Sequence, residues 1–383
     1  MRAQRPCGPA MRSATPPQNQ ANRISELESI RGVAALLVVF YHIPRWNPAF
    51  YDVAIVRNGY LMVDLFFVLS GFVIHRAYAS KLATGAELLR FQFLRFSRLY
   101  PVHLLFLLFF VVVEIGKYTM ASKLGVGSKP FSENSLTALV QQIFLVQAVG
   151  PTGNDFTFNV PAWSISVEFY TYLLFGLIVR HAGRAKNVVF LGIAVFALGA
   201  LVSQSLPGYG DLLHCFAGFF LGCMTAHLSS KVSLRLPSYA PLVTAAAFVA
   251  FLYLKTDKQH DPLVYLFSAV IILAVVFAEG GVAKQVLNSR PLHRLGTISY
   301  SVYMCHSAVL WVFNFTLGKL LKRPEVMFHG KSAPQLGAGE TFVCYCLVVL
   351  IVVLLSNAVY EWVEKPFRAR SRRVDFGNRS VLA

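Results

Sequence analysis

The chain has 383 residues, of which 56% are hydrophobic and only 14% are charged, which is roughly half the charged share of an average soluble domain. No soluble core buries so much apolar surface, so the composition excludes an ordinary soluble protein. The net charge of +17 would suit a nucleic-acid-binding protein. The basic residues lie between apolar blocks, however, and this placement indicates a membrane topology without a nucleic-acid partner.

The apolar residues form blocks of about 15 to 23, which is the length a helix needs to cross ~30 Å of hydrocarbon. We expect an all-α polytopic membrane bundle of about ten transmembrane helices. One membrane domain is expected over residues 25–367, between a disordered tail at 1–24 and a basic tail at 368–383. The expected spans lie near residues 30–44, 58–79, 101–120, 163–180, 187–204, 210–228, 238–254, 262–279, 298–318 and 340–361.

The block at residues 134–149 is ambiguous, because it is short and contains three glutamines. We expect an amphipathic or re-entrant segment that does not cross. With that topology, roughly two-thirds of the lysines and arginines fall on the side that holds both termini, which the positive-inside bias places in the cytoplasm. The bundle would then lie among the lipids of a plasma membrane, the inner membrane of a bacterium. If the block crossed, the cations of the 180–186 loop would lie outside.

The first expected span carries Arg31 at its start and His42 eleven residues later, about 16 Å away along a helix axis. If Arg31 lies near the cytoplasmic face, His42 lies at or beyond the middle of the membrane. An ionisable residue at that depth is costly unless it faces a polar cavity, so His42 is a candidate general base. The alternative is a buried histidine that hydrogen-bonds between helices.

Two carboxylates occupy the outer halves of later spans. Asp64 lies within about two turns of the outer surface in the second span, at a depth that His42 could share. A carboxylate beside a histidine fixes its tautomer and raises its basicity, so we expect Asp64 or Glu168 to orient His42. Asp64 could instead cap its helix. Trp163, five residues before Glu168, is either an interfacial anchor or a platform on which a sugar stacks.

Between the second and third spans, arginines alternate with bulky apolar residues on the cytoplasmic side. The guanidinium groups of Arg95 and Arg98 suit the phosphates of a nucleotide-bearing donor, although an interfacial helix that holds lipid headgroups is the alternative. In the ninth span, His306 lies ~12 Å from the cytoplasmic side, and its role is either catalytic or structural. The other histidines, His214 among them, have no comparable setting. The cysteines and histidines show no metal-ligand spacing, so we expect no metal.

Together, five motifs in this order resemble acyltransferase family 3. They are Arg31-Gly-x-Ala with His42, the run Val63 to Phe72 that contains Asp64, Arg95-x-x-Arg98-x-x-Pro101, Trp163-Ser164-x-x-x-Glu168 and Ser299-Tyr300-x-x-Tyr303-x-x-His306. The resemblance covers about residues 25–367 and implies a ten-span domain that acylates extracytoplasmic glycans or small molecules with acetyl-CoA from the cytoplasm.

The expected activity is therefore O-acylation, with an acyl group, in particular acetyl, moving from acyl-CoA to a hydroxyl of a carbohydrate or glycolipid. Arg31, Arg95 and Arg98 are assigned to the donor, and Trp163, Ser164 and His306 to the substrate. Direct transfer and a covalent acyl-histidine intermediate both stay open. The alternative function is a transporter or flippase of an acyl donor or lipid-linked sugar, since transport also uses buried charges.

Overall fold

The structure is a computed structural model that describes residues 24–124, 130–328, 331–374 and 376. The expected N-terminal tail lies outside the described residues, apart from Ile24. The long helices are α1 (Ser25–His42), α4 (Met62–Tyr78), α5 (Gly85–Leu124), α7 (Ala162–His181), α8 (Lys186–Ser203), α9 (Gly210–Lys231), α10 (Ala240–Leu254), α11 (Leu263–Phe277), α14 (Ser299–Phe315) and α15 (Ala338–Val359). The short helices are α2 (Pro48–Tyr51), α3 (Ala54–Arg57), α6 (Leu136–Phe144), α12 (Val282–Leu287), α13 (Arg290–Thr297) and α16 (Lys365–Ser371).

All ten expected spans fall on helices, but not all of these helices have the length and apolar character of a membrane crossing. α10 and α11 are apolar helices of 15 residues each, which is about 22 Å against ~30 Å of hydrocarbon. The structure therefore establishes a helical membrane bundle without confirming a count of ten crossings. Among the described residues, six segments qualify: Ala54–Tyr78, Gly85–Thr119, Ala162–His181, Gly183–Ser203, Gly210–Lys231 and Ala338–Ser371.

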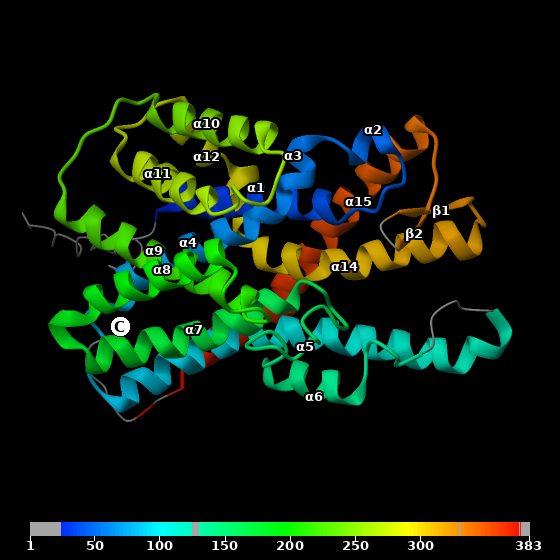
Figure 1. Ribbon diagram of the computed structural model, residues 1–383, viewed down its shortest axis with the longest axis horizontal. Coiled ribbons are helices and arrows are strands. Elements are labelled where there is room, and N and C mark those ends of the chain that lie inside the picture. Colours follow the sequence, from blue (N-terminus) through cyan, green and yellow to red (C-terminus); the bar gives the residue numbers. More distant parts are fainter. Residues whose placement is uncertain (1–23, 125–129, 329–330, 375, 377–383) are drawn as a thin grey trace, which may run out of the picture.

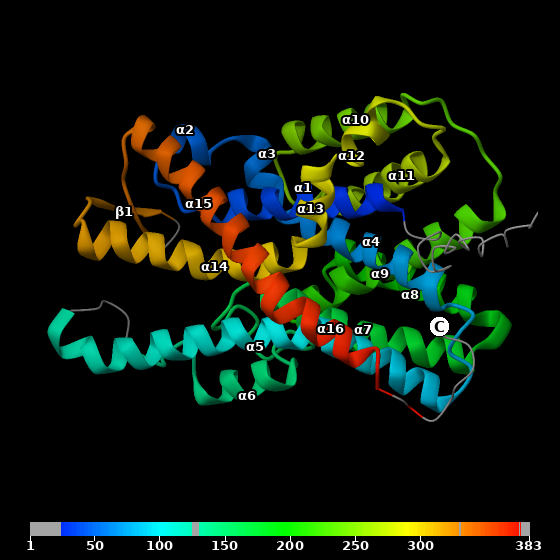
Figure 2. The ribbon, with the colours of Figure 1, turned by 180° about the vertical axis from the view of Figure 1, so that it is seen from behind.

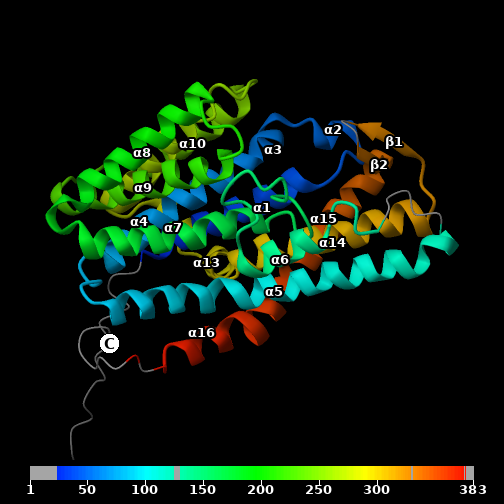
Figure 3. The same cartoon turned by 60° about the horizontal axis from the view of Figure 1, so that its bottom comes forward.

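Most of the long helices run along the longest axis of the molecule (Figure 1). The hairpin of β1 (Glu325–Phe328) and β2 (Lys331–Pro334) lies at one end with α2, while the α4–α5 and α7–α8 connections lie at the other end, in views from both sides (Figures 1 and 2). α5 extends along one flank of the bundle with α6 beside it (Figure 3). The two connections expected on the cytoplasmic side therefore lie at the same end of the bundle.

Glycines allow two pairs of helices to approach closely. A Cβ atom on Gly32 of α1 would lie 2.7 Å from the backbone nitrogen of Gly296 in α13. A Cβ atom on Gly71 of α4 would lie 1.8 Å from the carbonyl oxygen of Phe219 in α9. Small residues at such crossings let backbones pack in the membrane, where lipid offers no hydrophobic drive for helix association. These two contacts fix where α1 and α4 sit in the bundle.

α5 differs from the expected loop followed by a span. It is one helix of 40 residues that includes Pro101, so the segment around Arg95 and Arg98 is helical and continuous with the span. Proline is tolerated in membrane helices because the loss of one backbone hydrogen bond is compensated locally. α6 has nine residues, about 14 Å, so the block at 134–149 is too short a helix to cross. It docks on α5, where the carbonyl oxygen of Gln142 lies 2.9 Å from His103 Nε2.

Two smaller features were not predicted. The described chain contains a two-stranded antiparallel hairpin between α14 and α15, in which Val326 pairs with Ala333, because strands of four residues give too short a pattern to recognise. α16 continues to Ser371, inside the segment expected to be a basic tail. The buried Glu364, directly before α16, accepts a 3.0 Å hydrogen bond from Ser301 of α14, which ties the start of this last helix to the bundle. Arg368 of α16 pairs with the same carboxylate at 3.1 Å.

Candidate active site

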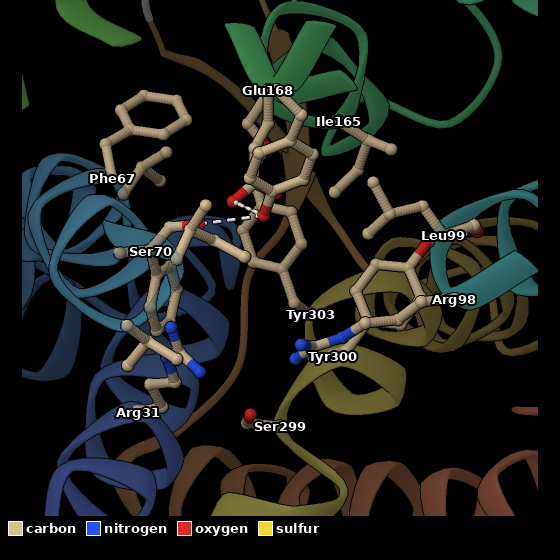
Figure 4. A pocket seen from close by; sticks show the side chains of 16 residues that line it. Arg31, Phe67, Ser70, Arg98, Leu99, Ile165, Glu168, Ser299, Tyr300 and Tyr303 are labelled. Carbon is tan, nitrogen blue, oxygen red and sulfur yellow. Dashed lines mark hydrogen bonds between the residues drawn. The ribbon is translucent and has the colours of Figure 1, made fainter. Parts of the chain in front are cut away.

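A cavity lies between α1, α4, α5, α7 and α14, and the polar residues of the sequence motifs converge on it (Figure 4). It contains about 700 Å³ of empty space, including its open mouth. Its wall on the α4 side is apolar apart from Ser70, whereas α1, α5, α7 and α14 contribute the other polar groups. The lining residues are Arg31, Val63, Phe66, Phe67, Ser70, Val73, Ile74, Arg98, Leu99, Ser164, Ile165, Glu168, Tyr172, Ser299, Tyr300 and Tyr303.

Two guanidinium groups enter this cavity from opposite sides. Arg31 comes from α1 and Arg98 from α5, with Ser299 between them in the close-up (Figure 4). Arg31 is held in place because its neighbour Gly32 is at the tight crossing with α13. The only carboxylate among the lining residues is Glu168, so the cavity has an excess of one positive charge. This charge balance suits an anionic ligand.

A short hydrogen-bonded chain spans the cavity from α4 to α7. The Tyr172 hydroxyl donates to Glu168 Oε1 at 2.6 Å and lies 2.7 Å from Ser70 Oγ. Because Tyr172 has one hydroxyl proton and gives it to Glu168, Ser70 is the donor to Tyr172. Glu168 is therefore anchored in the cavity lining that it shares with Arg31 and Arg98. That Glu168 orients His42 stays a prediction.

Two other sequence-predicted residues flank the cavity without lining it. Arg95 lies behind Tyr172, with its guanidinium carbon 5.9 Å from the centre of that ring and 5.6 Å from the centre of the Tyr78 ring. Trp163 packs edge-on against Phe67, with ring centres 6.0 Å apart. Both side chains support residues of the cavity wall.

His42, the half-buried last residue of α1, and the buried His306 of α14 form a pair outside the cavity lining, with ring centres 4.8 Å apart. His42 Nδ1 lies 2.9 Å from the carbonyl oxygen of Val38, one turn earlier in α1. A carbonyl oxygen can only accept, so Nδ1 carries the proton and Nε2 carries the lone pair. The contact with Val38 in its own helix thus favours this tautomer of His42, and an orienting carboxylate beside His42 stays a prediction.

Asp64 instead belongs to a separate polar cluster with His214 and Tyr265. Asp64 Oδ1 lies 3.0 Å from His214 Nδ1 and accepts a 2.8 Å hydrogen bond from the Tyr265 hydroxyl. The residues of α4 at 63, 66, 67 and 70 line the cavity. Asp64 is rotated by about 100° from Val63 on the helix, so it faces α9 and α11. Asp64 was expected beside His42, but its observed partner is His214, which was not predicted to belong to a site.

α14 connects the cavity to the histidine pair. Tyr303 lines the cavity, and its hydroxyl lies 2.8 Å from Ser164 Oγ. One turn further along α14, the His306 ring centre is 5.9 Å from that of Tyr303. The order from the arginines inward is therefore Tyr303, His306 and then His42.

Several cavity residues were missed, although local spacing contained a signal for one of them. Ser164, Glu168 and Tyr172 are four residues apart in turn, so they lie on one face of a helix, and Tyr172 could have been found from this periodicity. Ser70 and Tyr300 were quoted within motifs without a site role. Among the described residues, no group of three or more His, Cys, Asp or Glu side chains is placed to hold a metal ion.

Comparison with known proteins identifies the class. The sequence model of the family described as "Acyltransferase domain" matches residues 24–357. A match over most of the chain shows that this protein belongs to acyltransferase family 3, and it is an acyltransferase with membrane-spanning helices.

Three relatives illustrate the similarity. The "Putative acetyltransferase ORF330" of Acidianus two-tailed virus is 24% identical, over 75% of this chain and 83% of the relative. The "Putative peptidoglycan O-acetyltransferase YrhL" of Bacillus subtilis is 27% identical over 92% of this chain. The "O-acetyltransferase OatA" of Staphylococcus aureus is 22% identical over 90%. The chain spans 56% and 57% of the lengths of YrhL and OatA. No solved structure matches the chain significantly.

Proposed function

We propose that this protein is a membrane O-acyltransferase that moves an acetyl group from acetyl-CoA to a hydroxyl of a carbohydrate or glycolipid. The observation that carries the proposal is the link between a cationic cavity, which contains Arg31 and Arg98, and the His42–His306 pair through one helix, α14. The names of YrhL and OatA support acetyl transfer to oxygen, and the name of YrhL supports a cell-wall glycan as the acceptor class.

The donor enters from the cytoplasmic side in this proposal, with both termini on that side and the bundle in the plasma membrane. Arg31 and Arg98 hold the phosphates of the donor, because planar guanidinium groups form paired hydrogen bonds with phosphate oxygens. Arg95 supports this site from behind the Tyr172 ring. Glu168, anchored by Tyr172, keeps the two arginines from repelling each other when no anion is bound.

His42 acts as the general base on the acceptor. The Nε2 lone pair takes the proton of the acceptor hydroxyl as its oxygen attacks the thioester carbonyl carbon. The carbon–sulfur bond then breaks, and the imidazolium returns the proton to the departing sulfur. A positioned base typically contributes 10²- to 10⁴-fold to rate. Because Val38 fixes the ring tautomer, this chemistry needs no carboxylate beside His42.

The acceptor approaches the histidine pair from the outer side. Trp163 and Ser164 serve the substrate indirectly, by shaping its path. Ser164 bonds Tyr303, so it shapes the passage between donor and acceptor. Trp163 packs on the cavity wall through Phe67 and positions α7. Asp64 stabilises the junction of α4, α9 and α11 through His214 and Tyr265.

The test uses purified protein in proteoliposomes, acetyl-CoA labelled in the acetyl group, and oligosaccharides of the bacterial cell wall as acceptors. The expected result is a base-labile acetyl ester on the acceptor, formed with one equivalent of free CoA. A transporter or flippase would move labelled donor or sugar across the bilayer and form no ester. Translocation without an ester would therefore overturn the proposed function.

A further inference from the structure

His306 differs from the other histidines of the bundle interior in having no well-formed hydrogen bond. Its side chain has an exposed fraction of 0%, and neither ring nitrogen meets the distance and angle of a hydrogen bond within the described part of the chain. The carbonyl groups of Val302 and Tyr303, about one turn earlier in α14, lie near the ring without meeting that geometry. His42 bonds a carbonyl oxygen and His214 bonds a carboxylate. Buried polar groups in proteins are nearly always hydrogen-bonded, and an unpaired one is costly. An imidazole left unpaired on both edges therefore marks the place of a polar group that binds during function.

The position of His306 indicates which group that is. The ring lies between Tyr303, which lines the donor cavity, and His42, whose ring centre is 4.8 Å away. An acyl group delivered from the cavity toward His42 must pass the edge of this ring. The polar atom that a thioester presents to an N–H donor is its carbonyl oxygen, which accepts hydrogen bonds only.

We propose that an N–H group of His306 donates a hydrogen bond to the thioester carbonyl oxygen of the donor and stabilises the oxyanion formed when the acceptor attacks; this role rests on the proposed function. As the hydroxyl oxygen adds to the carbonyl carbon, the π electron pair moves onto the carbonyl oxygen. His306 keeps its proton throughout, while His42 Nε2 takes the hydroxyl proton. When the carbon–sulfur bond breaks, the electron pair returns and the carbonyl re-forms. A neutral imidazole has the one N–H donor that this role requires.

The two histidines of the pair are suited to different tasks. A general base needs a fixed tautomer, and His42 has one because Val38 accepts from its Nδ1. His306 makes no well-formed hydrogen bond to a carbonyl of its own helix, so its N–H is available to turn toward the thioester carbonyl. A purely structural histidine would satisfy its nitrogens within the bundle. The geometry therefore separates a base from an oxyanion donor.

Two substitutions at one position test this assignment. His306→Leu has similar bulk and no donor, whereas His306→Gln keeps an N–H donor but has no nucleophilic ring nitrogen. We expect His306→Leu to lower kcat by about 10²- to 10³-fold, the usual effect of removing one oxyanion donor, with a much smaller rise in the dissociation constant for acetyl-CoA. His306→Gln should recover a substantial part of kcat. His260→Gln is the matched control, because His260 is exposed in the α10–α11 connection.

An infrared measurement tests the same contact without an acceptor. Acetyl-CoA labelled with ¹³C at the carbonyl is bound to the wild type, and the carbonyl stretch is compared with that in solution. A hydrogen bond should shift the band to lower frequency, and His306→Leu should abolish the shift while His306→Gln retains it. This readout keeps the assignment testable if either variant turns over poorly for reasons of folding.

Three outcomes would overturn the assignment. One is a bound donor with no carbonyl shift in the wild type, which would leave the proposed function standing. Another is wild-type kcat in a folded His306→Leu variant. The third is an acetyl adduct on His306, trapped by acid quench and found by mass spectrometry, together with complete loss of activity in His306→Gln. That result would make His306 a covalent acyl carrier. Absence of acetyl-CoA binding by the wild type would instead overturn the donor assignment and this inference together.

Discussion

Replacing Arg98 by alanine is the most informative perturbation of the donor cavity. The lining carries Arg31, Arg98 and Glu168, so the substitution reduces its excess charge from one to zero. A hydrogen bond to a charged group is worth about 1.5–3 kcal/mol, and each 1.4 kcal/mol is tenfold in a dissociation constant. Losing one such contact should weaken acetyl-CoA binding by roughly 10- to 150-fold. The affinity of Arg98→Lys for acetyl-CoA should lie between those of the wild type and Arg98→Ala, because an ammonium group keeps the charge but loses the planar fork.

Isothermal titration calorimetry in detergent or nanodiscs measures this loss. Acetyl-pantetheine, which lacks the phosphates, serves as a second ligand, and its affinity should be nearly the same for the wild type and Arg98→Ala. Arg235→Ala is the control for loss of an arginine, because the Arg235 side chain is 85% exposed and pairs only with the exposed Glu279 in the described structure. Surface pairs of this kind contribute little.

The assignment of Arg98 to the donor phosphates fails if Arg98→Ala binds acetyl-CoA as tightly as the wild type does. It also fails if both ligands lose affinity equally, because Arg98 would then act on the pantetheine part or on the shape of the cavity. In either case the arginines would be better explained as anchors for anionic lipid headgroups.

Three further predictions concern packing, the buried carboxylate and topology. Gly71→Ala should lower the midpoint of thermal unfolding, because its Cβ would lie 1.8 Å from a backbone oxygen of α9, whereas Gly192→Ala has open space and should be neutral or stabilising; equal midpoints would contradict the close helix crossing. Asp64→Asn should lower the free energy of unfolding by about 1–3 kcal/mol and leave the affinity for acetyl-CoA, measured by calorimetry, unchanged. A variant with wild-type stability that has lost turnover would instead indicate a catalytic role for Asp64. In a cysteine-free background, a reagent applied from outside should label Asp257→Cys but not Ala185→Cys, and labelling of the latter would reverse the topology.

Much of the helical fold could be predicted from the sequence, because apolar blocks of membrane-spanning length are a local property. α7, α8 and α9 begin and end within about three residues of the expected spans. The continuity of α5 through Pro101 could not be read locally, since proline usually ends a helix in water and is tolerated in a membrane. The β1–β2 hairpin could not be predicted locally either, because strands of four residues are too short to show a periodic pattern.

The sequence identified many of the residues that belong to the site, but it did not identify which of them contact one another. Arg31, Arg98, Glu168 and Ser164 all line one cavity, although the arginines were expected near the cytoplasmic face and Glu168 in the outer half of its span. The partner of Asp64 was wrong because depth in the membrane does not say which way a helix face turns. His214 follows Asp64 by 150 residues, and only the packing of α4 on α9 brings the two together.

The most direct test of the central claim, that acetyl transfer uses His42 as the base, is a single-turnover assay of His42→Ala against the wild type. The variant should elute, unfold and bind acetyl-CoA like the wild type, because His42 lies outside the lining of the donor cavity. Its rate of ester formation on the acceptor should fall by about 10²- to 10⁴-fold. A folded, donor-loaded His42→Ala protein that transfers acetyl groups at nearly the wild-type rate would contradict the claim.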